Sequence, residues 1–328
     1  MRPAHADDRG RSLFVTQAAF PFFVGRGRSG TTLLLALFDS HPEMAVAYES
    51  HFTVGMALRR RRYERRSGFD RARFIEDLIA WDGFERWRMT RDEVTAALAA
   101  TLPQALPEAV RSVYTAYARG VGKSRYGEKS PGFVMHISLL AEMFPEARFV
   151  RMIRDGRDVT LSYRDLEWGP RDVEESAYYW KRFVAQGRAA GRSLGNERYR
   201  EVRYEALVDD PERHIKSLCE FLDLDFEKGM LSYFERADSV LGKMEGQLWA
   251  TGHQNLRRPP TKGLRDWRTQ MSKVDIKTFE ALAGDLLSEL GYERAFPKLP
   301  LDDRADAGLR WLRVQGRRVT HRLSKAWR

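Results

Sequence analysis

One glycine-rich loop limits the folds open to this chain more than any other segment. An apolar run from Phe20 to Val24 leads into the loop Gly25-Arg26-Gly27-Arg28-Ser29-Gly30-Thr31-Thr32, and a leucine-rich segment through Phe38 follows it. This order predicts a buried strand, a glycine turn and a buried helix. Backbone N–H groups and the positive end of the helix would then meet at the turn, so we expect it to bind a phosphate-like anion. The alternative is a glycine turn that only lets the strand and the helix pack closely.

The loop has the glycine spacing of a Walker A motif but lacks its lysine. Thr31 follows Gly30 at the place where that motif requires lysine. Because the lysine withdraws charge from the terminal phosphates of a nucleoside triphosphate, Mg²⁺-dependent phosphoryl transfer would lose a main stabilising group here. The loop offers Arg28 and three hydroxyl side chains instead. These groups suit a sulfuryl group, which carries less charge, without a metal.

Expected strands and helices alternate along the chain. The expected strands are 20–24, 45–48, 148–153 and 199–204, and the expected helices are 31–38, 131–143, one from about 155, 174–193, 211–222 and 273–290. The alternation predicts an α/β fold with a P-loop-type central parallel β-sheet flanked by helices. A polar, helical stretch from about 55 to 125 reads as an insertion. We expect a single domain over 1–303 and a basic amphipathic helix over 304–328.

A second anion site is expected where the strand 148–153 ends. Arg154 follows that strand, and Ser162 lies about two helical turns further on. Ligands of open α/β sheets bind at the carboxyl ends of the strands, and a guanidinium with a hydroxyl suits a phosphate monoester. Taken alone, such an arginine can equally be ion-paired on a surface. Together with the glycine loop, it indicates a ligand with two separated anionic groups.

The positive charge is concentrated in two short segments. The chain has a net charge of +10, of which 304–328 carry +7 and 59–66 carry +5, so the rest of the chain has −2. The body is therefore not a basic platform for nucleic acid. A solvated surface is an equally good interpretation of each basic segment. In the tail, Leu312, Gly316, Val319, Leu323 and Trp327 would share one helical face, which can lie on an anionic membrane.

Cysteine content and hydropathy indicate the compartment. The chain has one cysteine, Cys219, so it can form neither an intramolecular disulfide nor a metal site of several thiolates. We expect no metal site elsewhere. No run of about 18 apolar residues is present, and the first 19 residues are a poor secretory signal. We expect a cytoplasmic protein, with peripheral membrane contact through the tail as an open alternative.

These motifs resemble the sulfotransferase superfamily, whose sulfuryl donor is 3′-phosphoadenosine-5′-phosphosulfate (PAPS). The nearest branch is that of bacterial sulfotransferases related to tyrosylprotein sulfotransferases. The loop 25–32 resembles the 5′-phosphosulfate loop, and Arg154 with Ser162 resembles the 3′-phosphate motif. The stretches 47–50, 126–131 and 202–207, with Pro211 downstream, also match this branch. The match runs in order from Phe20 to Leu224, and more loosely over 261–268.

The resemblance implies roles for individual residues. The implied donor-binding residues are Arg26, Gly27, Arg28, Ser29, Gly30, Thr31, Thr32, Arg154, Ser162, Tyr204, Lys262 and Gly263, although 261–263 match the family's late contact only in part. The implied catalytic residues are Glu49 as general base, Lys129 on the bridging oxygen, Arg28 on the phosphosulfate, and His51 as the competing base. We expect partial burial to raise the pKa of Glu49 toward the working pH. In a strand, Glu49 and His51 would share a face.

The implied reaction is in-line sulfuryl transfer from PAPS to a hydroxyl or amine, with 3′-phosphoadenosine 5′-phosphate (PAP) as product. The acceptor would be a small molecule, carbohydrate or lipid. Tyrosylprotein sulfotransferases are membrane-anchored and lumenal, whereas this chain shows neither an anchor nor paired cysteines, so a protein tyrosine acceptor does not carry over. Four aromatic residues of the insert can line an acceptor pocket or belong to the core, and their helical spacing favours the core. They are Trp81, Phe84, Trp87 and Tyr114.

Two other classes of function fit some of these features. A P-loop kinase or NTPase would require ATP and Mg²⁺, and the missing lysine argues against it. A binding module would use the basic tail on nucleic acid or membrane, and the near-neutral body argues against that as the main role.

Overall fold

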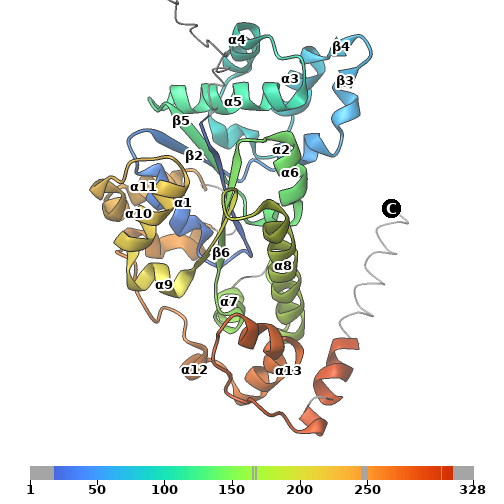
Figure 1. Ribbon diagram of the computed structural model, residues 1–328, viewed down its shortest axis with the longest axis vertical. Coiled ribbons are helices and arrows are strands. Elements are labelled where there is room, and N and C mark those ends of the chain that lie inside the picture. Colours follow the sequence, from blue (N-terminus) through green and yellow to red (C-terminus); the bar gives the residue numbers. More distant parts are fainter. Residues whose placement is uncertain (1–17, 165, 167, 245–249, 304, 313–328) are drawn as a thin grey trace, which may run out of the picture.

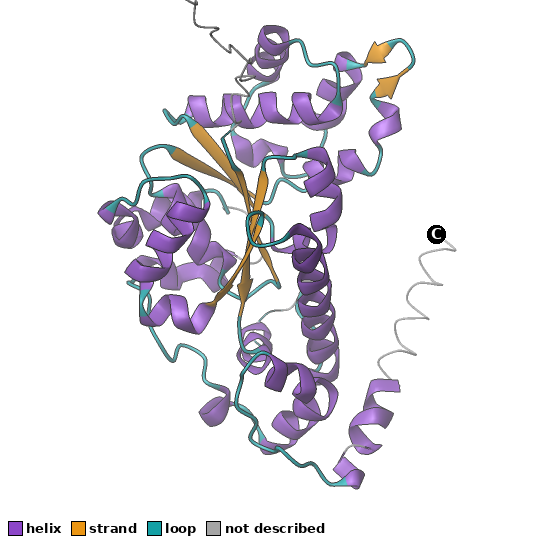
Figure 2. Ribbon diagram, viewed as in Figure 1, coloured by secondary structure: helices purple, strands orange, loops and turns teal. Residues whose placement is uncertain are grey.

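A central parallel sheet organises the chain. The computed structural model describes residues 18–164, 166, 168–244, 250–303 and 305–312. In these residues β2 (Met44–Tyr48), β5 (Arg125–Lys129), β1 (Phe20–Gly25), β6 (Ala147–Ile153) and β7 (Tyr199–Arg203) lie in that order and pair in parallel. The sheet is enclosed between two layers of helices (Figure 2). The predicted α/β fold is confirmed.

Each face of the sheet is covered by its own group of helices (Figure 1). One face packs on α1 (Thr31–Asp39), α9 (Tyr204–Asp209), α10 (Pro211–Phe221), the 3₁₀ segment η4 (Lys228–Arg236) and α11 (Ala237–Gly242). The other face packs on α5 (Leu106–Gly120), α6 (Ile137–Met143) and part of α8 (Val173–Leu194). A third apolar cluster joins α7 (Gly156–Tyr163) and α8 to α12 (Trp267–Gln270) and α13 (Lys273–Glu289). The leucines of α1 are buried because that helix lies between the sheet and η4.

The insert is helical, as expected, but also contains a small hairpin. Its helices are α2 (Phe52–Ala57), α3 (Arg71–Ile79), α4 (Arg91–Thr101) and α5 (Leu106–Gly120), with the 3₁₀ turns η1 (Arg60–Arg62) and η2 (Phe84–Trp87). The antiparallel strands β3 (Glu64–Arg65) and β4 (Gly68–Phe69) were not predicted. Phe84, Trp87 and Tyr114 are buried against one another, and Trp81 is partly buried against the same cluster. The favoured interpretation of these four aromatic residues as core is correct.

Two boundaries differ from the expected ones for local reasons. The stretch 131–143 is not one α-helix, because it begins as the 3₁₀ segment η3 (Pro131–His136), in which Phe133 N–H donates to Ser130 O at 3.0 Å. The strand expected over 199–204 ends at Arg203, because Tyr204 already begins α9.

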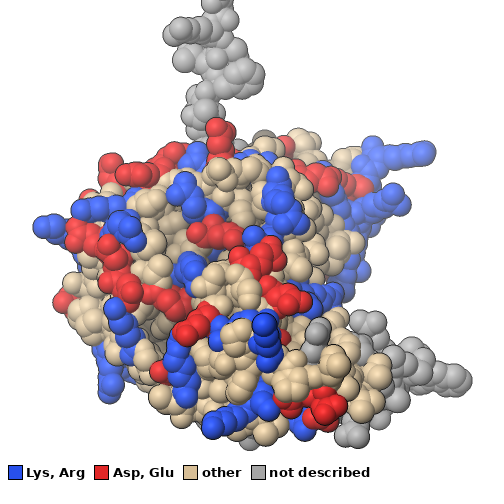
Figure 3. Space-filling view, turned by 60° about the horizontal axis from the view of Figure 1, so that its bottom comes forward, with Lys and Arg blue, Asp and Glu red and all other residues tan. Residues whose placement is uncertain are grey.

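Ion pairs within the fold neutralise part of the charge of the basic segment 59–66. In 59–66, Arg60 pairs with Glu64 at 2.6 Å, Arg62 with Asp77 at 2.8 Å and Arg65 with Asp70 at 3.4 Å. Basic and acidic side chains also lie intermixed over the face shown in Figure 3. Such alternation is typical of a solvated surface.

Part of the expected tail helix packs on the body. Residues 305–312 are helical, Ala307 is buried, and the Trp311 ring centre lies 4.9 Å from that of Tyr178 on α8. Residues 304 and 313–328, which hold most of the proposed membrane face, lie outside the described residues. Among the residues described, no helix is long and apolar enough to cross a membrane.

Candidate active site

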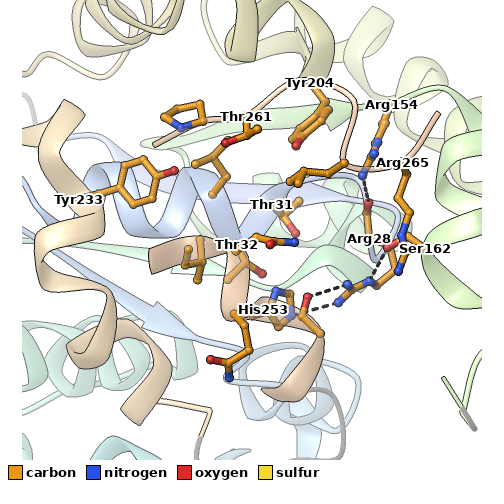
Figure 4. A pocket seen from close by; sticks show the side chains of 18 of the residues that line it. Arg28, Thr31, Thr32, Arg154, Ser162, Tyr204, Tyr233, His253, Thr261 and Arg265 are labelled. Atoms are coloured by element: carbon orange, nitrogen blue, oxygen red, sulfur yellow. Dashed lines mark hydrogen bonds between the residues drawn. The ribbon is translucent and has the colours of Figure 1, made fainter. Parts of the chain in front are cut away.

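A cavity of about 560 Å³ lies at the carboxyl ends of β1 and β6, where the sheet is expected to bind ligand (Figure 4). Its lining includes the loop residues Arg28 and Gly30, the first turn of α1, and Arg154, Ser162 and Tyr204. A segment far along the chain, 252–265, provides the opposite wall. The structure therefore brings both predicted anion motifs into one cavity.

Two glycines of the loop lie directly against tyrosine rings. A Cβ on Gly27 would stand 2.6 Å from the Tyr163 hydroxyl oxygen, and one on Gly30 would stand 2.5 Å from the Tyr204 ring. Gly30 also has φ 100°, in the left-handed region, and precedes α1 without a side-chain cap. The N-terminal end of α1 is therefore open toward the cavity, with its positive dipole end unneutralised by any side chain.

Arg28 is the most connected side chain of the cavity. Its Nε donates to Ser162 Oγ at 3.1 Å, its Nη2 donates to Gly252 O at 2.8 Å, and its Nη1 lies 3.3 Å from His253 Nε2 (Figure 4). A guanidinium has no acceptor, so His253 Nε2 must accept and the imidazole is neutral. Burial, followed by the charges of Arg28 and Lys129, lowers the pKa of His253 to about 3.

Arg154 forms the second anion motif with one nitrogen unused. Its side chain is buried, its guanidinium lies 4.4 Å from the Tyr204 ring centre, and Nη1 donates to Arg28 O at 3.4 Å. Its Nε is buried and has no hydrogen-bond partner among the described residues. Five other described arginines also have a buried Nε without a hydrogen-bond partner. It is therefore the position of Arg154 in the cavity wall, and not this nitrogen alone, that makes it a candidate for binding an anion.

Asp158, in the first turn of α7, adds an acidic group near Arg154. Its Oδ1 accepts the Trp267 N–H at 2.9 Å. Burial, reinforced by the charge of Asp155, raises the pKa of Asp158 to about 7 even though Arg154 lies nearby. Asp158 therefore titrates close to neutral pH.

Glu49 and Lys129 meet because they end neighbouring strands. Tyr48 of β2 is in register with Lys129 of β5, and Glu49 N–H donates to Lys129 O at 2.9 Å, so the two side chains start from one edge of the sheet. Lys129 Nζ lies 2.8 Å from Glu49 Oε1 and 3.7 Å from the Tyr48 ring centre. Lys129 is only 1% exposed and Glu49 15%. The result is an almost enclosed ion pair.

Two expectations about Glu49 are wrong. Burial favours a higher pKa for Glu49, but the charge of Lys129 and the hydrogen bonds from His51 and Lys129 outweigh it, so the pKa falls to about 2. Glu49 and His51 do not share a strand face either, because β2 ends at Tyr48 and both residues have φ near +40°. The turn still brings His51 Nε2 to 3.5 Å from Glu49 Oε2, with His51 half exposed.

Several residues expected to bind the donor lie elsewhere. The Arg26 guanidinium lies 4.8–5.3 Å from the ring centres of Tyr163, Tyr179 and Phe183, and Arg26 does not line the cavity. Lys262 pairs with Asp209 on the surface, and neither it nor Gly263 lines the cavity. Thr261, Leu264 and Arg265 of the same segment do so instead. Ser29 is buried, and neither it nor Gly27 is among the lining residues.

The sequence did not point to several residues of the far wall. These are Tyr233, Gly252, His253, Gln254, Asn255 and Arg265. They belong to 3₁₀ segments, η4 and η5 (Ala250–Arg257), and to the irregular chain that follows. Such segments have no regular apolar spacing, so the loose family match over 261–268 was the one signal near them.

The parallel α/β fold and the cavity lined by two arginine motifs are consistent with an enzyme that binds an anionic ligand. The model of the Sulfotransferase family matches residues 21–228, which is more than half of the chain. The chain therefore belongs to the sulfotransferase family and is a transferase enzyme. This membership decides against a kinase and against a non-enzymatic binding module as its main role.

Two curated relatives illustrate the family match. A protein-tyrosine sulfotransferase of Drosophila melanogaster is 24% identical over 277 residues, which are 83% of this chain and 51% of the relative. The nodulation protein NoeE of Sinorhizobium fredii is 25% identical over 332 residues, which are 93% of this chain and 72% of the relative. This chain thus spans about half the length of the fly protein.

Solved structures support the same fold. A sulfotransferase domain from the curacin biosynthetic pathway superposes with a TM-score of 0.59 at 18% identity, covering 85% of this chain and 99% of that domain. The sulfotransferase domain of the Synechococcus PCC 7002 olefin synthase gives a TM-score of 0.54 at 20% identity, covering 86% and 96%. At these identities the likeness concerns the fold alone.

Proposed function

We propose that the chain transfers a sulfuryl group from PAPS to a hydroxyl or amine of a small-molecule, carbohydrate or lipid acceptor. One observation carries the proposal: two anion-binding motifs, at Arg28 and at Arg154, line a single cavity at the sheet edge that also bears the Glu49–Lys129 pair. PAPS has anionic groups at both ends of its ribose, as such a cavity requires. The Arg154 guanidinium lines this cavity, and its planar set of donors suits a 3′-phosphate.

In the proposed mechanism, the donor supplies a sulfuryl group attached through a bridging oxygen to phosphate. Arg28 and residues 30–32 hold the phosphosulfate, while Arg154 and Ser162 hold the 3′-phosphate. Glu49 accepts the acceptor's proton as the acceptor oxygen or nitrogen bonds to sulfur and the bond from sulfur to the bridging oxygen breaks. Lys129 keeps its proton and stabilises the negative charge that develops on the bridging oxygen. Positioning and charge stabilisation account for most of the acceleration.

The low pKa of Glu49 is compatible with this role. Its main lowering interactions come from Lys129, at 2.8 Å, and from His51. If Lys129 turns toward the developing charge on the donor, Glu49 loses its strongest partner and becomes a better base. The ion pair would thus hold Glu49 in its charged, proton-accepting form until the donor is bound.

A direct test of the function is to supply PAPS and look for sulfuryl transfer. Incubation with PAPS and a panel of host metabolites should yield PAP and an acceptor with the added mass of a sulfuryl group. We expect EDTA to leave the rate unchanged, because the loop lacks the lysine around which Mg²⁺-nucleotide chemistry is organised. Activity that requires ATP and Mg²⁺ in place of PAPS would refute the proposal. Arg28→Ala, which removes a phosphosulfate contact, serves as the inactive control.

We also propose that donor affinity depends on pH through Asp158. Above about pH 7 Asp158 ionises, and its charge then opposes the binding of a phosphate at Arg154. Between pH 6 and pH 8, the affinity for PAP should therefore fall about fivefold more in the wild type than in Asp158→Asn. This difference corresponds to about 1 kcal/mol of charge repulsion. Calorimetry at both pH values measures this difference. The comparison with the variant is needed because a phosphate monoester itself titrates near pH 6; identical pH profiles of the two proteins would contradict the role of Asp158.

The compartment is likewise a proposal. The sole cysteine, Cys219, is buried, and burial raises the pKa of its thiol to about 12. An inert thiol and the lack of any second cysteine support our proposal of a reducing, cytoplasmic location.

A further inference from the structure

We propose that Glu128 is a positioning residue for the reaction, because its buried carboxylate fixes the backbone turn that presents Glu49 to Lys129. The inference rests on the proposed function and extends it to a residue outside the cavity. Glu128 directly precedes Lys129 in β5 and is fully buried. Like Glu49 and Lys129, it is not among the residues that line the cavity.

The carboxylate of Glu128 is held by three neutral donors. Ser50 N–H donates to Oε1 at 3.0 Å, Ser130 Oγ donates to the same oxygen at 2.5 Å, and the Tyr114 hydroxyl donates to Oε2 at 2.8 Å. Withdrawing a carboxylate from water is costly, and an apolar side chain would fill the same space without that cost. A carboxyl group buried here therefore calls for a hydrogen-bonding role that an apolar side chain cannot perform.

The backbone bound by Glu128 is strained. Ser50 lies between Glu49, with φ 42°, and His51, with φ 40°, and neither residue is a glycine. L-residues avoid this left-handed region. Two residues with positive φ on either side of Ser50 therefore keep this conformation only when their surroundings fix it. The bond from Ser50 N–H to Glu128 is one such restraint, and the bond from Glu49 N–H to Lys129 O is another. Together they determine where the Glu49 carboxylate lies.

The same network ties the turn to the helical insert. The Ser50 hydroxyl lies 3.1 Å from Thr53 Oγ1, which lies 3.1 Å from the hydroxyl of Tyr114 on α5. Ser50 is therefore held at both its N–H and its side chain. Because Tyr114 also bonds to Glu128, the polar chain closes into a ring inside an otherwise apolar core.

Glu128 also contributes charge next to Lys129. Burial lowers the pKa of Lys129, while Glu49 and, more weakly, Glu128 raise it. When Glu49 takes up the acceptor's proton, its charge is neutralised, and Glu128 then remains as a negative charge that favours protonated Lys129. Burial raises the pKa of Glu128 itself. A glutamine at this position would keep most hydrogen bonds and lose only this electrostatic contribution.

Four variants separate positioning from folding. Glu128→Ala removes the acceptor of Ser50 N–H, Glu128→Asp withdraws it by one methylene, and Glu128→Gln retains it. Arg111→Ala is the matched control, because it removes a partly buried polar side chain, which pairs with Glu146 at 2.6 Å, away from the cavity. Three quantities are measured for each: the rate of conversion of PAPS to PAP with water as acceptor, the PAP dissociation constant, and the midpoint of thermal unfolding.

We expect Glu128→Ala and Glu128→Asp to lose about 30- to 100-fold in rate, with the PAP dissociation constant within about threefold of the wild type. Glu128→Gln should recover most of the rate. Arg111→Ala should unfold at a lower temperature than the wild type but keep a nearly normal reaction rate. Should Glu128→Ala fail to fold, the milder Glu128→Asp provides the same comparison.

Two outcomes overturn the inference, and they are distinguishable from a failure of the proposed function. Rates of Glu128→Ala and Glu128→Asp within about threefold of a wild type that binds PAP and converts PAPS would overturn the positioning role alone. The same holds if Arg111→Ala loses rate as strongly as the Glu128 variants, since stability would then explain both. A wild type that neither binds PAP nor converts PAPS would overturn the proposed function, and the inference with it.

Discussion

Replacing Glu49 with glutamine is expected to lower kcat about 100-fold or more while leaving donor affinity nearly unchanged. The substitution keeps the size and one acceptor oxygen of the side chain but removes its ability to take a proton. Donor binding should survive because the proposed donor-binding groups, at Arg28 and Arg154, line the cavity, whereas Glu49 is not among its lining residues. Steady-state turnover of PAPS and calorimetric PAP binding, measured on the same preparation, give the two quantities.

His51→Ala is the control for this assignment. His51 lies 3.5 Å from Glu49 Oε2 and is half exposed, so its removal should change kcat much less than the loss of Glu49 itself. If Glu49→Gln retained near-normal turnover while His51→Ala lost it, His51 would be the base. The pKa of about 2 adds a pH criterion: stability that Glu49 contributes as a carboxylate is present above about pH 4.5 and is lost as the pH falls through about 2. Protonation of Glu49 in the ligand-free enzyme should therefore cause no fall in kcat/KM near neutral pH.

Replacing Arg154 with alanine should weaken PAP binding by about 30-fold or more, since a buried charge-assisted contact is worth about 2 kcal/mol. The guanidinium is buried against Tyr204 and leaves its Nε unpaired, so little else in the protein depends on that nitrogen. The loss should be selective for ligands with a 3′-phosphate. Calorimetry with PAP and with adenosine 5′-phosphosulfate distinguishes the two cases.

Arg154→Lys is the matched variant for this prediction. It keeps the charge but loses the planar, two-pronged donor geometry, and should fall between the wild type and the alanine variant. An equal loss of affinity for adenosine 5′-phosphosulfate in Arg154→Ala would show that Arg154 does not recognise the 3′-phosphate.

Those parts of the site that follow from regular structure could be predicted from the sequence. The apolar run 20–24 and the glycines after it fixed a strand and a turn, and the parallel arrangement then placed the ends of β1, β2, β5 and β6 at one edge. Glu49 and Arg154 each follow a strand that was expected, whereas Lys129 ends β5, which was not expected, and was singled out by the family resemblance alone. Their proximity is thus a consequence of topology.

Features that depend on side-chain geometry or irregular chain could not be predicted in this way. The pKa of Glu49 depends strongly on a 2.8 Å contact with Lys129. The spacing of residues along the sequence does not reveal such a distance between side chains. His253 and Arg265 reach the cavity from irregular chain, and Lys262 pairs with Asp209 instead of facing the cavity. Glu128 lies in the stretch 126–131 that matches the family, but its hydrogen bonds to Ser50 and Tyr114 arise only in the folded chain.

The far wall of the cavity has a consequence for the order of events during synthesis. The ribosome delivers the chain from its N-terminus at roughly 5–20 residues per second. Both anion motifs and the Glu49–Lys129 pair have emerged by residue 162, whereas Gly252, His253 and Arg265 follow some ninety residues or more later. A nascent chain can therefore assemble the central sheet while the cavity still lacks one side. A ligand of the complete cavity can stabilise only the nearly finished protein, so the early sheet must rely on its own apolar packing.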